Sequence, residues 1–351
     1  MPLTSLEKDI LIQTSRLFWL FHRDPRENLR EKIKTLFSNS PSPEFRDQLF
    51  QHRLNNLFFH YSQGLLPPKY IDLFKNDYLN QGMINSLFLL EFESLIKKIP
   101  DSIPVIPLKG IAFIFNNYIY PEPGLRIMED IDLLVNEKDY DVILNILFEN
   151  NYYIPEQYRN LRSKHFHYLL KKKLGRNIIT LELHFALSNK KRFQVDSESF
   201  FSSSAPLFPE HPNILYPSVN DLVYYLIFHA GFHYIFERLQ WLGEIEGIVH
   251  KFNSEIDFNY IISRAEKENT SILVFNTLAA LCSLYKIDLP DSVMKIISKK
   301  KDKFLSDNQH VWNREIFRSR LFQYKFGLKS MDTISNKILW SSEKIKNHFK
   351  N

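Results

Sequence analysis

Ten residues near the middle of the chain, Arg-Ile-Met-Glu-Asp-Ile-Asp-Leu-Leu-Val at 126–135, constrain the fold more than any other stretch. Side chains alternate between the two faces of a β-strand, so Asp130 and Asp132 would share one face and the apolar residues the other. Two carboxylates held that close repel each other unless a cation lies between them. Mg²⁺ is often bound by one or two carboxylates together with substrate phosphates, so the stretch indicates metal-assisted chemistry on phosphates. An edge strand with a solvated acidic face fits the same residues equally well.

The composition is that of a globular protein with enough apolar material for a sizeable core. The chain has 351 residues, which suggests about two domains, with 44% hydrophobic and 24% charged residues. A net charge of +5 suits an anionic substrate but is too small and too dispersed to indicate a nucleic-acid surface. The N-terminal residues lack a signal-peptide pattern, and the single cysteine fits a reducing compartment. We therefore expect a cytoplasmic protein without a membrane partner.

Hydrophobic periodicity divides the chain into three parts. Apolar residues recur at three- and four-residue spacing at the start, which predicts a helical region over 1–99. Residues 100–214 combine short β-branched runs with an amphipathic helix over 138–150, and helical patterns return over 215–351. We expect an α+β fold in which a small mixed β-sheet core is flanked by N-terminal and C-terminal helical regions.

Individual elements follow from the same patterns. In the central part, a helix is expected at 111–120, and strands at 103–108, 126–135, 152–154, 165–171 and 177–185. The last two strands are joined by Lys-Lys-Leu-Gly-Arg, which predicts a hairpin. After the central part, two helices are expected at the end of the chain, preceded by helices at 222–234, 236–250, 257–267, 270–285 and 290–299.

Two features beside the aspartates could bind phosphate. Lys109 and Gly110 lie between a predicted strand and a predicted helix, where a glycine lets the backbone approach a ligand and the helix N-terminus presents free N–H groups. Arg126 can bind phosphate oxygens in a bidentate way. The alternative for Arg126 is an ion pair with Glu129 or Asp130.

A third carboxylate, Glu182, lies on a later predicted strand. If the sheet is antiparallel or mixed there, Glu182 could come alongside the two aspartates. Three carboxylates on neighbouring strands could hold two divalent ions, which stabilise the attacking and the leaving oxygen in a phosphoryl displacement. His184 shares a face with Glu182 and could orient it or contact substrate. Glu182 alone is more typical of a strand surface.

Several histidines have two interpretations each. His229 and His233 are spaced i, i+4 and share one face of a predicted helix. The sequence lacks the glutamate of a His-Glu-x-x-His zinc protease, so a packing role is favoured over metal chemistry. His165 and His167 have the same two interpretations.

In this order, the features resemble the uncharacterised nucleotidyltransferase family within the DNA polymerase beta-like nucleotidyltransferase superfamily. The resemblance covers roughly residues 85 to 300. It rests on Leu-Lys-Gly at 108–110, Tyr-Pro at 120–121 leading into Arg-x-x-x-Asp-Ile-Asp-Leu-Leu-Val at 126–135, Lys-His-Phe-His at 164–167, Leu-Glu-Leu-His at 181–184, and His-Ala-Gly-Phe-His followed by Arg-Leu-Gln-Trp-Leu at 229–242.

The resemblance implies that Asp130, Asp132 and Glu182 are the catalytic carboxylates and that they hold Mg²⁺ or Mn²⁺. Lys109 and Gly110 would stand where the superfamily usually has a Gly-Ser phosphate-binding turn. The separation from Gly110 to Asp130 is also longer than the superfamily usually shows.

The resemblance also points to residues that could assist the catalytic carboxylates. Glu244 stands where the family tends to have an aspartate, which keeps the carboxylate but changes its reach. The histidines expected to be accessory are His167, His184, His229 and His233.

The implied reaction transfers a nucleoside monophosphate from an NTP, with ATP as the expected donor, to a hydroxyl, and releases pyrophosphate. The resemblance does not determine the acceptor, which could be a small molecule or a peptide or protein. Among nucleic acids, only a tRNA end is considered as an acceptor. The alternative function is a catalytically inactive module that binds nucleotide or a protein partner. An inactive member should have lost a carboxylate, and all three are present here.

Overall fold

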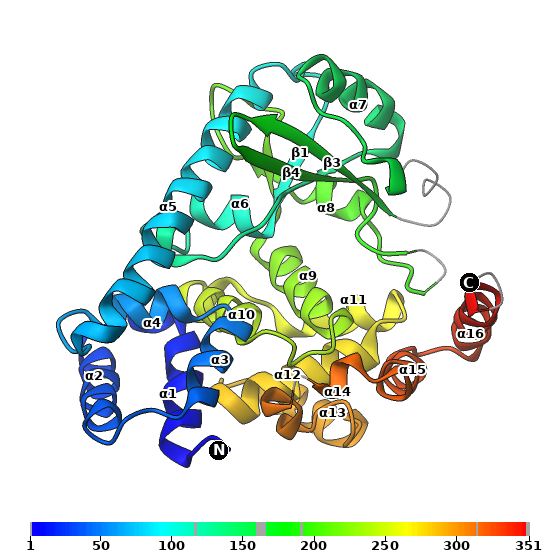
Figure 1. Cartoon of the computed structure of the whole chain (residues 1–351). Coiled ribbons are helices and arrows are strands. Elements are labelled where there is room, and N and C mark those ends of the chain that lie inside the picture. The colour runs from blue at the N-terminus through cyan, green and yellow to red at the C-terminus, as the bar shows by residue number, and fades with distance from the viewer. Residues whose placement is uncertain (1, 116–117, 159–165, 190–191, 314, 349–351) are drawn as a thin grey trace. The chain divides into compact units, whose positions relative to one another are not determined.

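The computed structural model describes residues 2–115, 118–158, 166–189, 192–313 and 315–348. The chain forms two compact units, each assembled from three separate stretches. Unit 1 comprises Met1–Met83, Ile119–Ile127 and Val223–Asp332. Unit 2 comprises Ile84–Tyr118, Met128–Leu222 and Thr333–Asn351. Figure 1 shows the helices and strands of both units and labels most of them.

Unit 2 contains a four-stranded sheet in the order β1–β2–β4–β3. Strand β2 is antiparallel to β1 and parallel to β4, and β3 and β4 form an antiparallel hairpin. The expected α+β fold with a small mixed sheet is therefore confirmed. The strands are β1 (Val105–Leu108), β2 (Ile131–Val135), β3 (His167–Leu174) and β4 (Asn177–His184), and a separate pair is formed by β5 (Ala205–Pro206) and β6 (Leu215–Tyr216).

Strand β2 is an inner strand of this sheet, and all five of its residues are buried. Asp132 is 3% exposed and Leu134, on the same face, is fully buried. An edge strand with a solvated acidic face is therefore excluded. Both edges of β2 are paired, one with β1 and the other with β4.

Helices of unit 2 support the sheet. Helix α6 (Lys109–Ile114) contacts β1 and β2, and unit 2 also contains α7 (Tyr140–Glu149), α8 (Glu198–Ser202) and α16 (Ile334–His348). The long helix α5 (Pro68–Ile96) contributes Glu91, which accepts hydrogen bonds from Lys172 Nζ at 2.9 Å and Tyr152 Oη at 3.2 Å. These hydrogen bonds hold the C-terminal part of α5 against β3.

Three local predictions in this unit are wrong. The helix expected at 111–120 is replaced by the shorter α6, because Phe115 takes an extended backbone conformation. The hairpin turn is shorter than predicted, since Gly175 adopts a φ of +60° and Leu174 pairs directly with Asn177. The strand expected at 152–154 is a single bridge from Tyr153 to Lys171.

Unit 1 is helical. It contains the first part of α5, most of α9, and the helices α1 (Ser5–Ser15), α2 (Arg23–Ser38), α3 (Pro43–Gln51), α4 (Asn55–Ser62), α10 (Leu239–Lys251), α11 (Phe258–Lys267), α12 (Ser271–Tyr285), α13 (Asp291–Lys300), α14 (Glu315–Arg318) and α15 (Arg320–Lys329). Helix α9 (Val219–Phe232) begins after Ser218, whose hydroxyl accepts a hydrogen bond from Asp221 N at 3.2 Å. Among the described residues, three α-helices follow residue 300, where two were expected, because Ser319 caps a separate start for α15.

Helices α1 and α10 pack at close range in unit 1. Gly243 of α10 faces the backbone carbonyl of Ser15, and a Cβ at Gly243 would collide with that oxygen. One turn later, a Cβ at Gly247 would lie 2.8 Å from Leu17 Cβ. The two glycines therefore let the start and the later part of the chain share one core.

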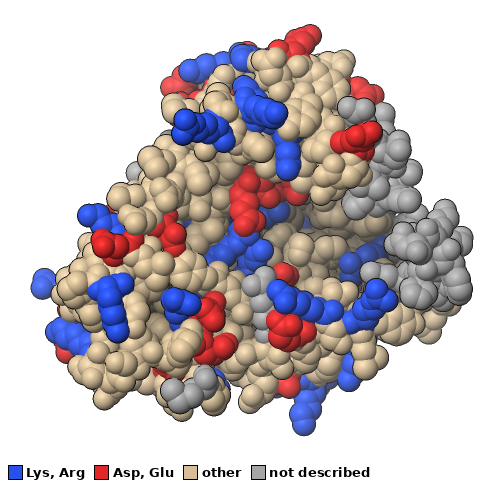
Figure 2. All heavy atoms as spheres, viewed as in Figure 1, with Lys and Arg blue, Asp and Glu red and all other residues tan. Residues whose placement is uncertain are grey.

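Charged side chains of both signs are interspersed on the face drawn in Figure 2. This agrees with a net charge of only +5 spread along the sequence. None of the helices in the described ranges combines the length and the apolar character needed to cross a bilayer.

Candidate active site

The strand register of unit 2 brings the predicted carboxylates together. In the parallel pairing of β2 and β4, Asp132 is opposite Glu182. The strand expected at 126–135 begins only at Ile131, so Asp130 lies one residue before β2 and not on the strand. One oxygen from each of the three carboxylates lies within 4.8 Å of the others. The neighbourhood predicted for Asp130, Asp132 and Glu182 is therefore present in the fold.

Asp132 has two cationic neighbours. Its Oδ1 lies 2.9 Å from Lys109 Nζ and 3.0 Å from His184 Nε2. Burial by itself would raise the pKa of Asp132, but the Lys109 ammonium and the hydrogen bond with His184 outweigh it and hold the pKa well below its usual range. Asp132 is therefore an ionised carboxylate in a buried place.

Lys109 owes its position to an unusual backbone conformation. It follows β1 directly, and Leu108 at the end of β1 pairs with Asp132. Its φ of +47° lies in the left-handed region, which costs a residue with a Cβ about 1–3 kcal/mol and is often found at functional sites. Gly110, expected to let the backbone approach a ligand, is buried and has no positive φ. The strained residue is thus the one whose ammonium reaches Asp132.

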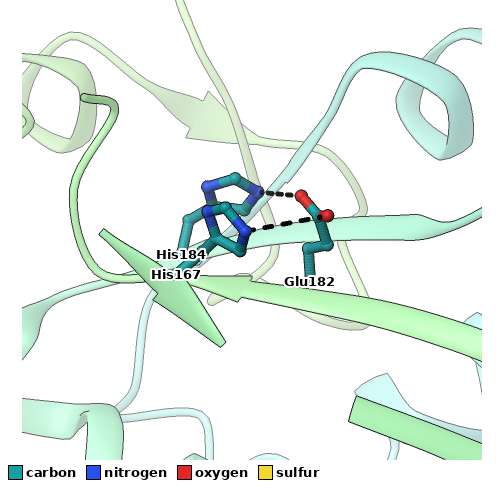
Figure 3. A group of neighbouring side chains, drawn as sticks. All are labelled: His167, Glu182 and His184. Atoms are coloured by element: carbon teal, nitrogen blue, oxygen red, sulfur yellow. Dashed lines mark ion pairs between the residues drawn. The ribbon is translucent and has the colours of Figure 1, made fainter. Parts of the chain in front are cut away.

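Two neighbouring imidazoles face the Glu182 carboxylate from one side (Figure 3). His184 Nε2 is 3.4 Å from Glu182 Oε2, and His167 Nε2 is 3.7 Å from Glu182 Oε1. His184 is 3% exposed, whereas the side chains of His167 and Glu182 keep 22% and 21% of their surface. The carboxylate is therefore open on one side and held by histidines on the other.

The two imidazoles differ in charge. Burial alone would lower the pKa of His184, but its hydrogen bonds with Asp132 and Glu182 raise the pKa above the ordinary value. Burial, together with the charge of His184, lowers the pKa of His167 to about 4. Burial opposes ionisation of Glu182, yet its hydrogen bond with His184 lowers the pKa of Glu182. These shifts favour an ionised Glu182, a protonated His184 and a neutral His167.

The donor set fits a hard divalent cation. Asp130, Asp132 and Glu182 offer carboxylate oxygens, which are the ligands that Mg²⁺ and Mn²⁺ prefer. One oxygen of each carboxylate lies within 4.8 Å of the others, a spacing at which one cation can be shared. Such a site can bind and orient an anionic phosphate chain.

Residues 41–285 match the model of a protein family described as uncharacterised nucleotidyltransferase. The chain belongs to this family. The match covers the central sheet with α3 to α5 before it and α9 to α12 after it. No curated protein and no solved structure matches the chain.

Arg126 of this nucleotidyltransferase family member is paired with Glu244 inside unit 1. Arg126 Nε donates to Glu244 Oε1 at 2.7 Å, and Tyr120 Oη donates to the same oxygen at 3.0 Å. Arg126 is 5% exposed and Glu244 2% exposed. Glu244 thus has a buried structural contact, and Tyr120, for which no role was predicted, shares it. A phosphate role for Arg126 stays a prediction, and the phosphate would have to compete with Glu244.

The helical histidines lie in unit 1. The ring of His229 is 5.0 Å from that of Trp241, and the ring of His233 is 5.2 Å from it. The His229 contact joins α9 to α10, whereas His233 lies one residue after the end of α9, although both histidines were expected on one helix. A site role for His229 or His233 remains a prediction. His165 lies outside the described residues.

Proposed function

We propose that the protein is a metal-dependent nucleotidyltransferase that transfers a nucleoside monophosphate from an NTP to a hydroxyl and releases pyrophosphate. The observation that carries the proposal is the parallel register of β2 and β4, which sets Glu182 beside Asp132 with Asp130 next to them. Family membership supports nucleotidyl transfer as the class of reaction. ATP is the expected donor, and the acceptor is a small molecule, a peptide or protein, or a tRNA end.

Glu182 is the proposed general base. It would accept the proton of the acceptor hydroxyl on a carboxylate oxygen while the hydroxyl oxygen forms a bond to the α-phosphorus. The bond from the α-phosphorus to the bridging oxygen breaks, and pyrophosphate leaves. The lowered pKa of Glu182 keeps it ionised at neutral pH, which is the form that accepts a proton.

The remaining residues would bind and orient the triphosphate. Asp130, Asp132 and Glu182 would hold Mg²⁺ or Mn²⁺, and a divalent ion there neutralises phosphate charge and fixes the reacting oxygens. Lys109 would stabilise negative charge on the phosphates, with Gly110 allowing close approach of the backbone. Arg126 is proposed as a second cation for the phosphates.

Asparagine substitutions test this assignment. Asp130→Asn and Asp132→Asn should each reduce transfer by at least about a hundredfold, since loss of one preorganised electrostatic group commonly costs 10²–10³-fold. Transfer is measured with a radiolabelled NTP and Mg²⁺, and circular dichroism reports whether the fold is kept. Asp101→Asn is the matched control, because Asp101 is exposed and lies outside the cluster.

Near-normal transfer by both substituted proteins would refute the mechanism. If the wild-type protein binds NTP without any turnover, the alternative of an inactive nucleotide-binding module gains the support instead. The two results are distinguished by measuring nucleotide binding alongside transfer.

A further inference from the structure

We propose that His167, His184 and Glu182 form a binding site for a transition-metal dication of the Zn²⁺ or Co²⁺ kind. This site differs in chemistry from the oxygen-rich group of Asp130 and Asp132, although Glu182 belongs to both. The geometry of this site does not depend on the proposed transferase activity.

The three side chains are held by one rigid hairpin. In the antiparallel pairing of β3 and β4, His167 is directly opposite His184, and Glu182 is two residues before His184. Residues at i and i+2 of a strand share a face, and directly opposed residues across strands do so too. All three side chains therefore extend to the same side, and Figure 3 shows both imidazoles directed at the Glu182 carboxylate.

The spacing of the donor atoms matches a small coordination shell. Zn–N and Zn–O bonds of about 2.0–2.2 Å put neighbouring ligand atoms of a tetrahedral site roughly 3.3–3.6 Å apart. The observed separations from Glu182 oxygens are 3.4 Å to His184 Nε2 and 3.7 Å to His167 Nε2. The longer of these exceeds an ordinary N–H···O hydrogen bond, so hydrogen bonding alone does not explain why the imidazole faces the carboxylate.

The donor types favour a transition metal over Mg²⁺. Two imidazoles and a carboxylate are the protein ligands of many zinc sites, whereas Mg²⁺ takes oxygen ligands. Asp132 Oδ1 lies 3.0 Å from His184 Nε2 and could supply a fourth donor. A cation there would thus have two nitrogen and two oxygen ligands.

The cluster is buried on the side of His184 and partly exposed on the side of His167 and Glu182. His184 is buried, its Nδ1 has no hydrogen-bond partner among the described residues, and its Nε2 faces the Asp132 and Glu182 oxygens, where a cation would replace the Nε2 proton. The side chains of His167 and Glu182 remain about one-fifth exposed. An ion can therefore reach the nitrogens from the side of His167 and Glu182.

Titration of the full-length, metal-free protein with Co²⁺ and Zn²⁺ tests the proposal. We expect one Co²⁺ per chain, with the visible absorption bands of a four-coordinate site, displaced by Zn²⁺ but not by millimolar Mg²⁺. His167→Gln and His184→Gln should each weaken Zn²⁺ binding by about tenfold or more, because loss of even an outer partner of a metal ligand costs roughly 10–100-fold. His167→Gln is the decisive variant, since His184 is more deeply buried and its replacement can disturb folding.

His233→Gln is the matched control, because His229 and His233 form another neighbouring pair, with ring centroids 4.6 Å apart. Weaker binding in His233→Gln with unchanged binding in His167→Gln would overturn the assignment, as would Zn²⁺ affinity no greater than Mg²⁺ affinity. Mg²⁺-dependent transfer is measured separately on the same proteins. If the wild-type protein catalyses transfer but binds neither Co²⁺ nor Zn²⁺, this inference alone is refuted. If it binds these ions but catalyses no transfer, the proposed function alone is refuted.

Discussion

Lys109 has a left-handed backbone conformation, and its ammonium group contacts a buried carboxylate. Its ammonium and His184 lie against the same oxygen of Asp132, at 2.9 and 3.0 Å. A residue with a Cβ is rarely held at a φ of +47° unless its surroundings over-determine it. The position of Lys109 is therefore part of how the fold keeps Asp132 ionised.

Replacing Lys109 by methionine should destabilise the metal-free protein. The change removes one cation from a buried carboxylate, and breaking such a pair costs about 3–5 kcal/mol, less here because His184 stays. Urea unfolding followed by circular dichroism measures the change, and Lys109→Arg is the charge-keeping control. Mg²⁺ should restore part of the lost stability, since a bound cation replaces the missing charge. An unchanged unfolding midpoint would show that the pair contributes little.

At the scale of elements, helix ends and helix crossings hold unit 1 together. Helix α1 begins with a capping box in which Glu7 N donates to Thr4 Oγ1 at 3.2 Å and Thr4 N donates to Glu7 Oε2 at 2.8 Å. Glu7 also accepts a hydrogen bond from Ser42 N at 2.7 Å, immediately before α3. One side chain thus organises the starts of two helices.

This arrangement predicts a pH dependence. Burial opposes ionisation of Glu7, but the hydrogen bonds from Thr4 and Ser42 outweigh it and lower the pKa of Glu7 in the folded protein. A lowered folded pKa gives stability that is present above the unfolded value of about 4.3 and is lost as the pH falls through the folded value. Glu7→Gln should therefore be less stable at pH 7 by about 1 kcal/mol. The gap between the two unfolding free energies should close on acidification, and a gap independent of pH would contradict this account.

The crossing of α1 and α10 predicts a severe effect of one methyl group. Gly243→Ala would place a Cβ against the carbonyl of Ser15, which is backbone and cannot rotate away. Overpacking of this kind destabilises by about 1–3 kcal/mol or more. Thermal unfolding measures the loss, with Gly82→Ala as control, because the nearest atom to a Cβ at Gly82 is 3.6 Å away. Equal melting temperatures for Gly243→Ala and wild type would show that the helices can separate without loss.

Much of this element structure could be predicted, and the failures have physical causes. Alternating and three-to-four-residue patterns located β1, β2, β4 and most helices. The predicted end of α6 and the predicted length of the hairpin turn were wrong. In each case the backbone angles of a single residue, Phe115 or Gly175, determine where the element ends. The pairing of β2 with β4 stayed open, since parallel pairing of strands so far apart in the chain depends on tertiary packing.

At the scale of the molecule, residues distant in sequence build each unit. Three predicted regions follow one another along the chain, whereas unit 1 joins helices from both ends through contacts such as Arg16 with Glu246 at 2.8 Å. Periodicity shows that a helix has a buried face but not which partner covers it. The same limit applied to the site: Asp130, Asp132 and Glu182 were predicted together, whereas the pairing of Arg126 with Glu244 was not.

The proposed reaction transfers the α-phosphoryl group of an NTP together with its nucleoside. Incubation of the protein and Mg²⁺ with cell extract and either α-labelled or γ-labelled ATP, and then the other NTPs, tests this transfer. We predict that α-label enters an acceptor as a monophosphate adduct visible by mass spectrometry, that γ-label leaves as pyrophosphate, and that Asp130→Asn gives neither. Transfer of γ-label to the acceptor, or an adduct formed equally well by Asp130→Asn, would contradict the account.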